Sequence, residues 1–171
     1  MLSIRRRVVF IRGLPGSGKS WLASTHFSDM HLVEADQYFM SNGVYSYSKE
    51  RIADAHVWAL KQMRSKRRVV VANTFTRKWE LDFYYTYASN PLVITCVGSH
   101  SNIHGVPSDV IEEMRQRWEP IEGEVILSNI TTSSVDVEYK GCSIEFSKIK
   151  NRWARHKSLL ECIDALIKKL S

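Results

Sequence analysis

The sequence predicts an α/β domain whose parallel sheet is covered by helices on both faces. Two observations support this prediction. The runs 69–72 (VVVA) and 92–97 (LVITCV) are almost wholly apolar, which is typical of parallel strands buried on both faces. Segments with helical spacing of apolar residues follow such runs, and strands that alternate with helices form parallel sheets.

The expected elements follow from apolar runs and from turn residues. Ser48 is placed to cap a helix, Pro107 to begin one, and Asn90-Pro91 to end one. Asn42-Gly43 is a turn signal, so the segment 41–48 is predicted to be a loop. The predicted strands are 7–12, 31–34, 69–72, 92–97 and 124–127, and the predicted helices are 18–27, 49–65, 78–88 and 107–118.

The pattern changes after residue 121. Segments 135–139 and 142–146 alternate between apolar and polar residues around Lys140-Gly141, which predicts a hairpin. A last helix is expected over 148–170. The 171 residues fit one domain. We therefore interpret 1–171 as a single domain, with a core of 1–120 and a hairpin–helix extension of 121–171.

Composition narrows the possible classes of protein. No apolar run is long enough to span a bilayer and none resembles a cleavable signal, so we expect a cytoplasmic protein without membrane contact. The three cysteines show neither metal-ligand spacing nor a disulfide framework. The net charge of +6 mildly favours polyanionic partners such as nucleic acid, and the oligomeric state is not predicted.

One motif has a specific chemistry. It matches G-x-x-x-x-G-K-[ST] between a predicted strand and a predicted helix. Its glycines let backbone N–H groups face phosphate oxygens, Lys19 should reach the β- and γ-phosphates, and Ser20 should bind Mg²⁺. We predict a site for ATP and Mg²⁺. Its residues are Gly13, Leu14, Pro15, Gly16, Ser17, Gly18, Lys19, Ser20 and the adjoining Trp21.

Asp36 comes directly after the second predicted strand. Ligands of parallel α/β sheets lie beyond the carboxyl ends of the strands, so Asp36 should face the γ-phosphate. A carboxylate there can act as general base toward a hydroxyl. It could instead organise Mg²⁺ through water, or simply cap the loop. Thr74, Arg77 and Lys78 follow the third long strand and should lie at the same edge.

Several segments together resemble one family. The resemblance is to the phage polynucleotide 5′-hydroxyl kinase group of P-loop kinases, and still more to related AAA-type kinase domains, over about residues 7–118. It implies a P-loop kinase-like fold and transfer of the ATP γ-phosphate to a 5′-hydroxyl of DNA or RNA. The residues that carry it are Gly13 to Ser20, Glu34-Ala35-Asp36-Gln37-Tyr38-Phe39, Ala55-His56, Trp58, Asn73-Thr74, Trp79-Glu80 and His104-Gly105-Val106-Pro107.

By this resemblance Asp36 matches the general base, Lys19 and Ser20 match the P-loop pair, and Thr74 lies near the acceptor. Three positions depart from the family. Ala72 or Asn73 replaces an acidic residue, Phe39 replaces a phosphate-binding arginine, and Ser101 replaces a lid arginine.

Other side chains have two interpretations each. Arg115 or Arg117 could supply the lid cation or pair with Glu112 and Glu113. Arg77 and Lys78 could hold a nucleic-acid phosphate or be a charge pair at a helix start. His56 could contact substrate or be a hydrogen-bonded structural histidine, and Trp79 is expected in the core.

Three functions are therefore open. The first is an ATP-dependent kinase acting on a 5′-hydroxyl of DNA or RNA, with Asp36 as base. The second is a nucleoside or other small-molecule kinase, which the short lid and Phe39 favour. The third is a nucleotide-binding module with little catalysis.

Overall fold

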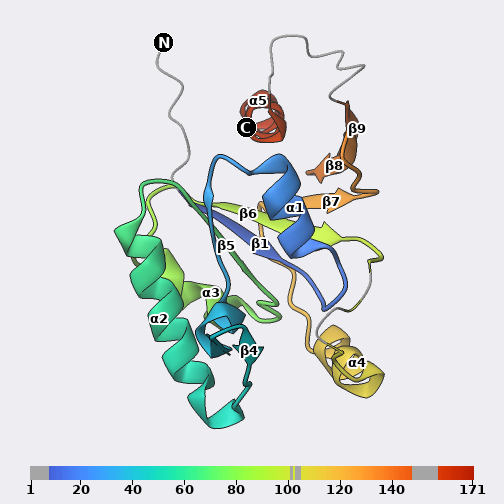
Figure 1. Cartoon of the computed structure of the whole chain (residues 1–171). Helices are drawn as coiled ribbons and strands as arrows, with labels where there is room; N and C mark the ends of the chain where they lie inside the picture. The colour runs from blue at the N-terminus through green and yellow to red at the C-terminus, as the bar shows by residue number, and fades with distance from the viewer. Residues whose placement is uncertain (1–7, 101, 103–104, 148–157) are drawn as a thin grey trace.

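The computed structural model describes residues 8–100, 102, 105–147 and 158–171. Residue 7, Ser101, His104 and the expected helical segment 148–157 lie outside these described ranges. Within them the main sheet has seven strands in the order β2-β5-β1-β6-β7-β8-β9, with helices on both faces (Figure 1). The strands of this sheet are β1 (Val8–Arg12), β2 (His31–Val33), β5 (Val69–Asn73), β6 (Leu92–Val97), β7 (Val125–Ser128), β8 (Ser134–Tyr139) and β9 (Cys142–Ser147).

Helices cover both faces of this sheet, and further helices lie in the connections between its strands. The helices are α1 (Lys19–His26), the 3-10 helix η1 (Ala35–Phe39), the 3-10 helix η2 (Lys49–Arg51), α2 (Ile52–Ser65), α3 (Lys78–Tyr85), α4 (Ser108–Gln116) and α5 (Leu159–Leu170). Strand β1 shows the two faces clearly. Val9 and Ile11 pack with α1 and α5, whereas Val8 and Phe10 pack with α2 and α3. Because side chains alternate along a strand, a strand buried on both faces is apolar throughout, as predicted.

The parallel strands bring their carboxyl ends to one edge. β1 pairs in parallel with β5 and β6, β5 with β2, and β6 with β7. The segments that follow these strands therefore meet at the same edge. In Figure 1 this is the lower edge, where η1, β4 and α4 all lie.

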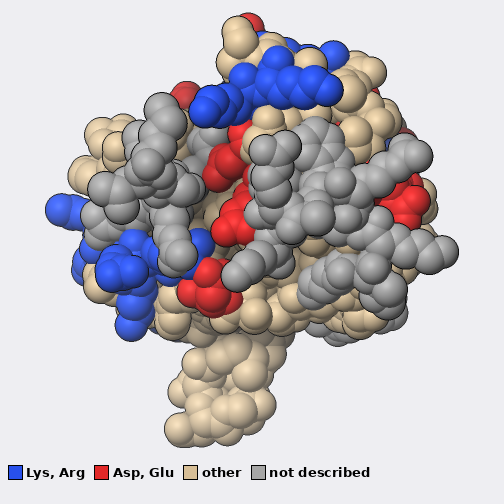
Figure 2. Space-filling view, turned by 90° about the horizontal axis from the view of Figure 1, so that it is seen from above, with Lys and Arg blue, Asp and Glu red and all other residues tan. Residues whose placement is uncertain are grey.

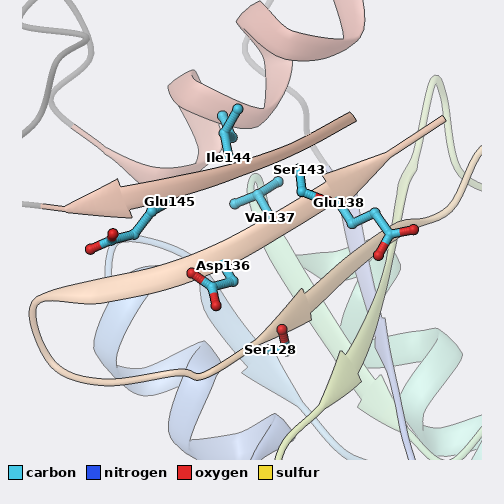
Figure 3. A pocket seen from close by; sticks show the side chains of 7 residues that line it. All are labelled: Ser128, Asp136, Val137, Glu138, Ser143, Ile144 and Glu145. Carbon is cyan, nitrogen blue, oxygen red and sulfur yellow. The ribbon is translucent and has the colours of Figure 1, made fainter. Parts of the chain in front are cut away.

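The predicted C-terminal hairpin is present and it extends the main sheet. β8 pairs antiparallel with β7, and β9 antiparallel with β8. The Lys140-Gly141 turn has φ of 48° and 74°, the left-handed conformation that tight hairpin turns require. Ile144 points toward α5, while Asp136 points away from it into a shallow hollow of about 340 Å³ (Figure 3).

The segment 41–48 differs from its prediction as a loop. β3 (Met40–Ser41) and β4 (Val44–Tyr45) pair antiparallel around the Asn42-Gly43 turn. Each strand has only two residues, which is too short for a recognisable alternation. The helix expected from residue 49 begins instead as η2, and Ser48 Oγ donates to the Glu50 carboxylate (2.8 Å) rather than accepting from a helix N–H.

The last residue of β1 is a fully buried arginine. Arg12 pairs with Glu124 (3.2 Å), its guanidinium lies 3.9 Å from the centre of the Trp118 ring, and it donates to the Glu119 carbonyl (2.9 Å). Burial lowers the pKa of Arg12, and the charge of Glu124 opposes that shift. Because Arg12 directly precedes the glycine-rich loop, this network anchors one end of the loop to the segment after α4.

No helix within the described residues is long and apolar enough to cross a bilayer. Figure 2 shows the described charged residues on the face seen from above, opposite the carboxyl edge. There Lys and Arg side chains form separate groups with Asp and Glu side chains between them (Figure 2).

Candidate active site

The glycine-rich loop joins β1 to α1 at the carboxyl edge. Gly16 and Gly18 have φ of 79° and 87°, a conformation that side chains with a Cβ rarely adopt. Ser17 N–H donates to the Leu14 carbonyl (3.0 Å), which closes the loop into a tight curl. α1 begins directly at Lys19, so the positive end of a helix dipole adjoins the curl.

The segment after β6 packs against this loop. His100 N–H donates to the Gly16 carbonyl (2.8 Å), and the His100 ring lies 5.5 Å from that of Trp21. A Cβ at Gly18 would clash with the exposed His100 ring, which would have to move. Gly18 is therefore required by conformation first, and its replacement would also displace His100. Trp21, predicted with the nucleotide-binding residues, contacts this segment.

The Lys19 ammonium is held inside the loop. Its Nζ donates to the carbonyls of Gly13 (2.9 Å) and Leu14 (3.0 Å). Burial lowers the pKa of Lys19, and the charges of Cys96, Glu34 and Asp36 oppose that shift. A phosphate anion in the loop would give this half-buried cation a stronger acceptor than the two neutral carbonyls.

Ser20 contacts a residue that the sequence prediction did not assign to the site. Its Oγ donates to the carboxylate of Glu34, the residue after β2. A hydroxyl beside a carboxylate is a donor set that suits Mg²⁺, which commonly takes one or two carboxylates and completes its shell with waters and phosphates. No group of three or more His, Cys, Asp or Glu side chains in the described part of the chain could hold a metal ion. The sequence predicts Glu34 as the last residue of a strand, and no motif spacing marks it as a metal-binding residue.

Asp36 lies in the first turn of η1, half-buried. The Tyr45 hydroxyl donates to its Oδ1 (3.2 Å), and burial together with the charge of Asp36 raises the pKa of Tyr45 to about 12. Asn73, the last residue of β5, holds the start of η1, because Ala35 N–H donates to Asn73 Oδ1 (2.9 Å). Asn73 is one of the positions where the resembled family has an acidic residue, and here its amide positions the helix that carries Asp36.

Phe39 stands where the resembled family has a phosphate-binding arginine. Phe39 is 3% exposed and packs with Ala35 and Ala55, so it cannot reach a substrate phosphate. Arg51 lies on the surface nearby: its Nη2 donates to the Tyr38 hydroxyl (2.5 Å), and its guanidinium stands 4.8 Å from the centre of the Tyr38 ring. Arg51 is thus a cation held against η1, although it comes from another element.

The predicted acceptor residues occupy different positions. The Thr74 carbonyl accepts from Gly13 N–H (3.4 Å), so Thr74 adjoins the phosphate loop. Arg77 and Lys78 are exposed at the start of α3. His56 Nδ1 lies 2.8 Å from the Tyr84 hydroxyl, between α2 and α3, and burial lowers its pKa. This environment matches the structural interpretation of His56.

The two lid candidates also have partners. Arg115 pairs with Glu112 one turn earlier on α4, and Arg117 Nε donates to Thr76 Oγ1 (3.1 Å). Trp79 corrects a prediction: it is 63% exposed in the first turn of α3 rather than part of the core. Its side chain points away from the sheet because the core face of α3 is filled by Leu81 and Tyr84.

A hollow lies beside the loop. Its volume is about 570 Å³, and it adjoins the phosphate loop through His100. It is lined by the end of β6 and by the segments that follow β6 and β7: Val97, Gly98, Ser99, His100, Asn129, Ile130 and Thr131.

The sheet order and the loop define this chain as a nucleotide-binding P-loop protein with a kinase-like fold. The profile of a family described as an AAA domain matches residues 8–101, which is more than half of the chain, and the chain belongs to that family. The prediction of an AAA-type domain is therefore confirmed, as is the predicted fold class.

Two individual proteins illustrate these likenesses. A gluconokinase from Sinorhizobium meliloti 1021 superposes with a TM-score of 0.53 at 16% identity, over 75% of this chain and 87% of that one, which supports the fold. Human NEDD4-binding protein 2 is 26% identical over 153 residues, which cover 75% of this chain. The match spans only 8% of that much longer protein.

Proposed function

We propose that this protein transfers the γ-phosphate of ATP to a hydroxyl group, with Asp36 as the general base. One observation carries the proposal: the half-buried Asp36 carboxylate stands at the same edge as the phosphate loop, on the 3-10 helix that Asn73 holds. A motor or a switch needs no such carboxylate directed at an acceptor, whereas a kinase does.

The chemistry follows from these positions. Asp36 accepts the proton of the acceptor hydroxyl as its oxygen bonds to the γ-phosphorus, and the bond from that phosphorus to the β,γ-bridging oxygen breaks to release ADP. Lys19 and the loop amides neutralise charge that develops on the phosphate oxygens. Ser20 and Glu34 would hold Mg²⁺, which supplies further charge neutralisation when bound. The hollow beside His100 would receive the nucleotide base.

For the acceptor, we propose the 5′-hydroxyl end of DNA or RNA. Cations that could hold the phosphates of a nucleic acid lie on the surface around this edge: Arg51 against η1, and Arg77 and Lys78 at the start of α3. The exposed Trp79 follows them directly and offers a stacking surface.

A small-molecule acceptor is the second candidate. The fold likeness to a gluconokinase supports it, as does the burial of Phe39 where the resembled family uses an arginine. A small acceptor would need neither Arg77 nor Trp79.

A panel of acceptors tests the proposal. Labelled ATP and Mg²⁺ are incubated with 5′-hydroxyl DNA and RNA oligonucleotides, with the same oligonucleotides already carrying a 5′-phosphate, with free nucleosides, and with gluconate. We expect label on the 5′-hydroxyl oligonucleotides alone. Label on nucleosides or gluconate alone would establish the second candidate, and nucleotide binding without any transfer would refute phosphotransfer.

A further inference from the structure

The hairpin that carries Tyr45 is uncharged and exposes several large apolar side chains. Residues 40–48 include no charged side chain. Met40 is 50% exposed, Val44 66%, Tyr45 42% and Tyr47 54%. Contiguous exposed apolar side chains on a soluble domain commonly mark a binding surface. This surface adjoins the proposed general base.

The two tyrosine rings are fixed by one buried ring. Phe39 lies edge-on to both, with ring centres 6.3 Å from Tyr45 and 5.2 Å from Tyr47. Between the two tyrosines, Ser46 N–H donates to the Phe39 carbonyl (3.0 Å). Because Phe39 is almost fully buried, the rings have a firm support and lose little further freedom when a ligand binds.

A hydrogen bond connects this surface to the acceptor position. The Tyr45 hydroxyl contacts Asp36 Oδ1 at 3.2 Å. An acceptor whose hydroxyl approaches Asp36 must therefore place its neighbouring atoms close to the hairpin. A nucleobase has a flat aromatic face that can stack there, and stacking on an aromatic ring contributes about 1–3 kcal/mol per base.

We propose that Tyr45 and Tyr47 form an aromatic platform on which the terminal nucleobase of the acceptor stacks. Tyr45 also positions the Asp36 carboxylate through its hydroxyl. The inference rests on the proposed function insofar as Asp36 marks the acceptor position. It adds that the acceptor is recognised through a base, without hydrogen-bond readout of its identity, so the four bases should bind comparably.

The test measures binding and transfer separately. Binding of a 3′-fluorescein single-stranded oligonucleotide with a 5′-hydroxyl is followed by anisotropy, with Mg²⁺ and a non-hydrolysable ATP analogue present. Tyr47→Leu should weaken binding about 5- to 150-fold, the equivalent of the stacking energy. Tyr87→Leu is the matched control, since Tyr87 is also 50% exposed but pairs with Arg64 at the far end of α2.

An abasic 5′-terminal residue supplies the decisive comparison. It should weaken binding to the unaltered protein, and Tyr47→Leu should then cause no further loss. Equal losses from Tyr47→Leu on intact and abasic ends, or no loss on either, would overturn the platform. If binding depends on Tyr47 as expected but no oligonucleotide is phosphorylated, the platform stands and the proposed function fails. If the oligonucleotides are phosphorylated but their binding does not depend on Tyr47, only the platform is refuted.

Discussion

The phosphate side of the site is built from backbone, whereas the acceptor side is built from side chains. Around the loop, the positive φ of Gly16 and Gly18 and the start of α1 create the anion site, and Lys19 rests on loop carbonyls. On the acceptor side, the Tyr45 hydroxyl contacts the Asp36 carboxylate nine positions earlier. A backbone site requires a fixed spacing of residues and so leaves a motif, which a site assembled from side chains does not.

The largest expected effect is on phosphate transfer, and it comes from changing Asp36 on the acceptor side. Asp36→Asn should lower phosphate transfer by about 10²- to 10⁴-fold, the usual contribution of a general base, and leave ATP affinity unchanged. Turnover under saturating ATP and calorimetric titration with ATP measure the two quantities. Asp54→Asn, an exposed carboxylate on α2, is the matched control. Normal turnover by Asp36→Asn would show that another group takes the proton.

Lys19, unlike Asp36, should be needed both for ATP binding and for transfer. Lys19→Ala should reduce both ATP affinity and transfer, with transfer falling about 10²- to 10³-fold, because the cation contacts phosphate in the ground state and the transition state. Since only the protonated amine binds, ATP affinity of the unaltered protein should fall as pH rises through the pKa of Lys19, which burial lowers from the usual 10.5. Lys61→Ala, at an exposed position on α2, should change neither ATP affinity nor transfer. Undiminished ATP binding by Lys19→Ala would remove this lysine from the phosphate site.

Gly18 tests whether the phosphate side depends on backbone conformation. Gly18→Ala should lower the free energy of unfolding by about 1–3 kcal/mol, because its φ of 87° strains a residue with a Cβ. Denaturant unfolding gives the value. The new Cβ would also meet the exposed His100 side chain. Adding His100→Ala separates the two causes. If backbone strain is the cause, Gly18→Ala should still lower the free energy of unfolding in the His100→Ala background. If the contact with His100 is the cause, that loss should disappear.

The same contrast explains what could be predicted from the sequence. The loop, the buried strands and the C-terminal hairpin depend on local patterns, and each is present. Arg51 and Tyr38 are thirteen positions apart, and no spacing rule connects them. The resemblance predicts Trp79 in the core, but Leu81 and Tyr84 already fill that face of α3.

The smallest expected effect concerns the contact that joins the hairpin to Asp36. The pKa of Tyr45 is raised from 10 to about 12 by burial and by the neighbouring carboxylate. Tyr45 should therefore stay protonated, and able to donate to Asp36, across the physiological range. The raised pKa favours folding below pH 10, and this contribution is lost as pH rises toward 12, because the unfolded chain ionises first.

Ultraviolet absorbance of tyrosinate, taken as the difference between the unaltered protein and Tyr45→Phe, should give a midpoint near pH 12. Asp36→Asn should move that midpoint down, because it removes the nearby negative charge. Asp54→Asn should leave it in place. A Tyr45 midpoint that does not respond to Asp36→Asn would mean that the two side chains do not interact in solution. The hairpin would then no longer be connected to the proposed general base, and its aromatic rings would have to be explained apart from the acceptor.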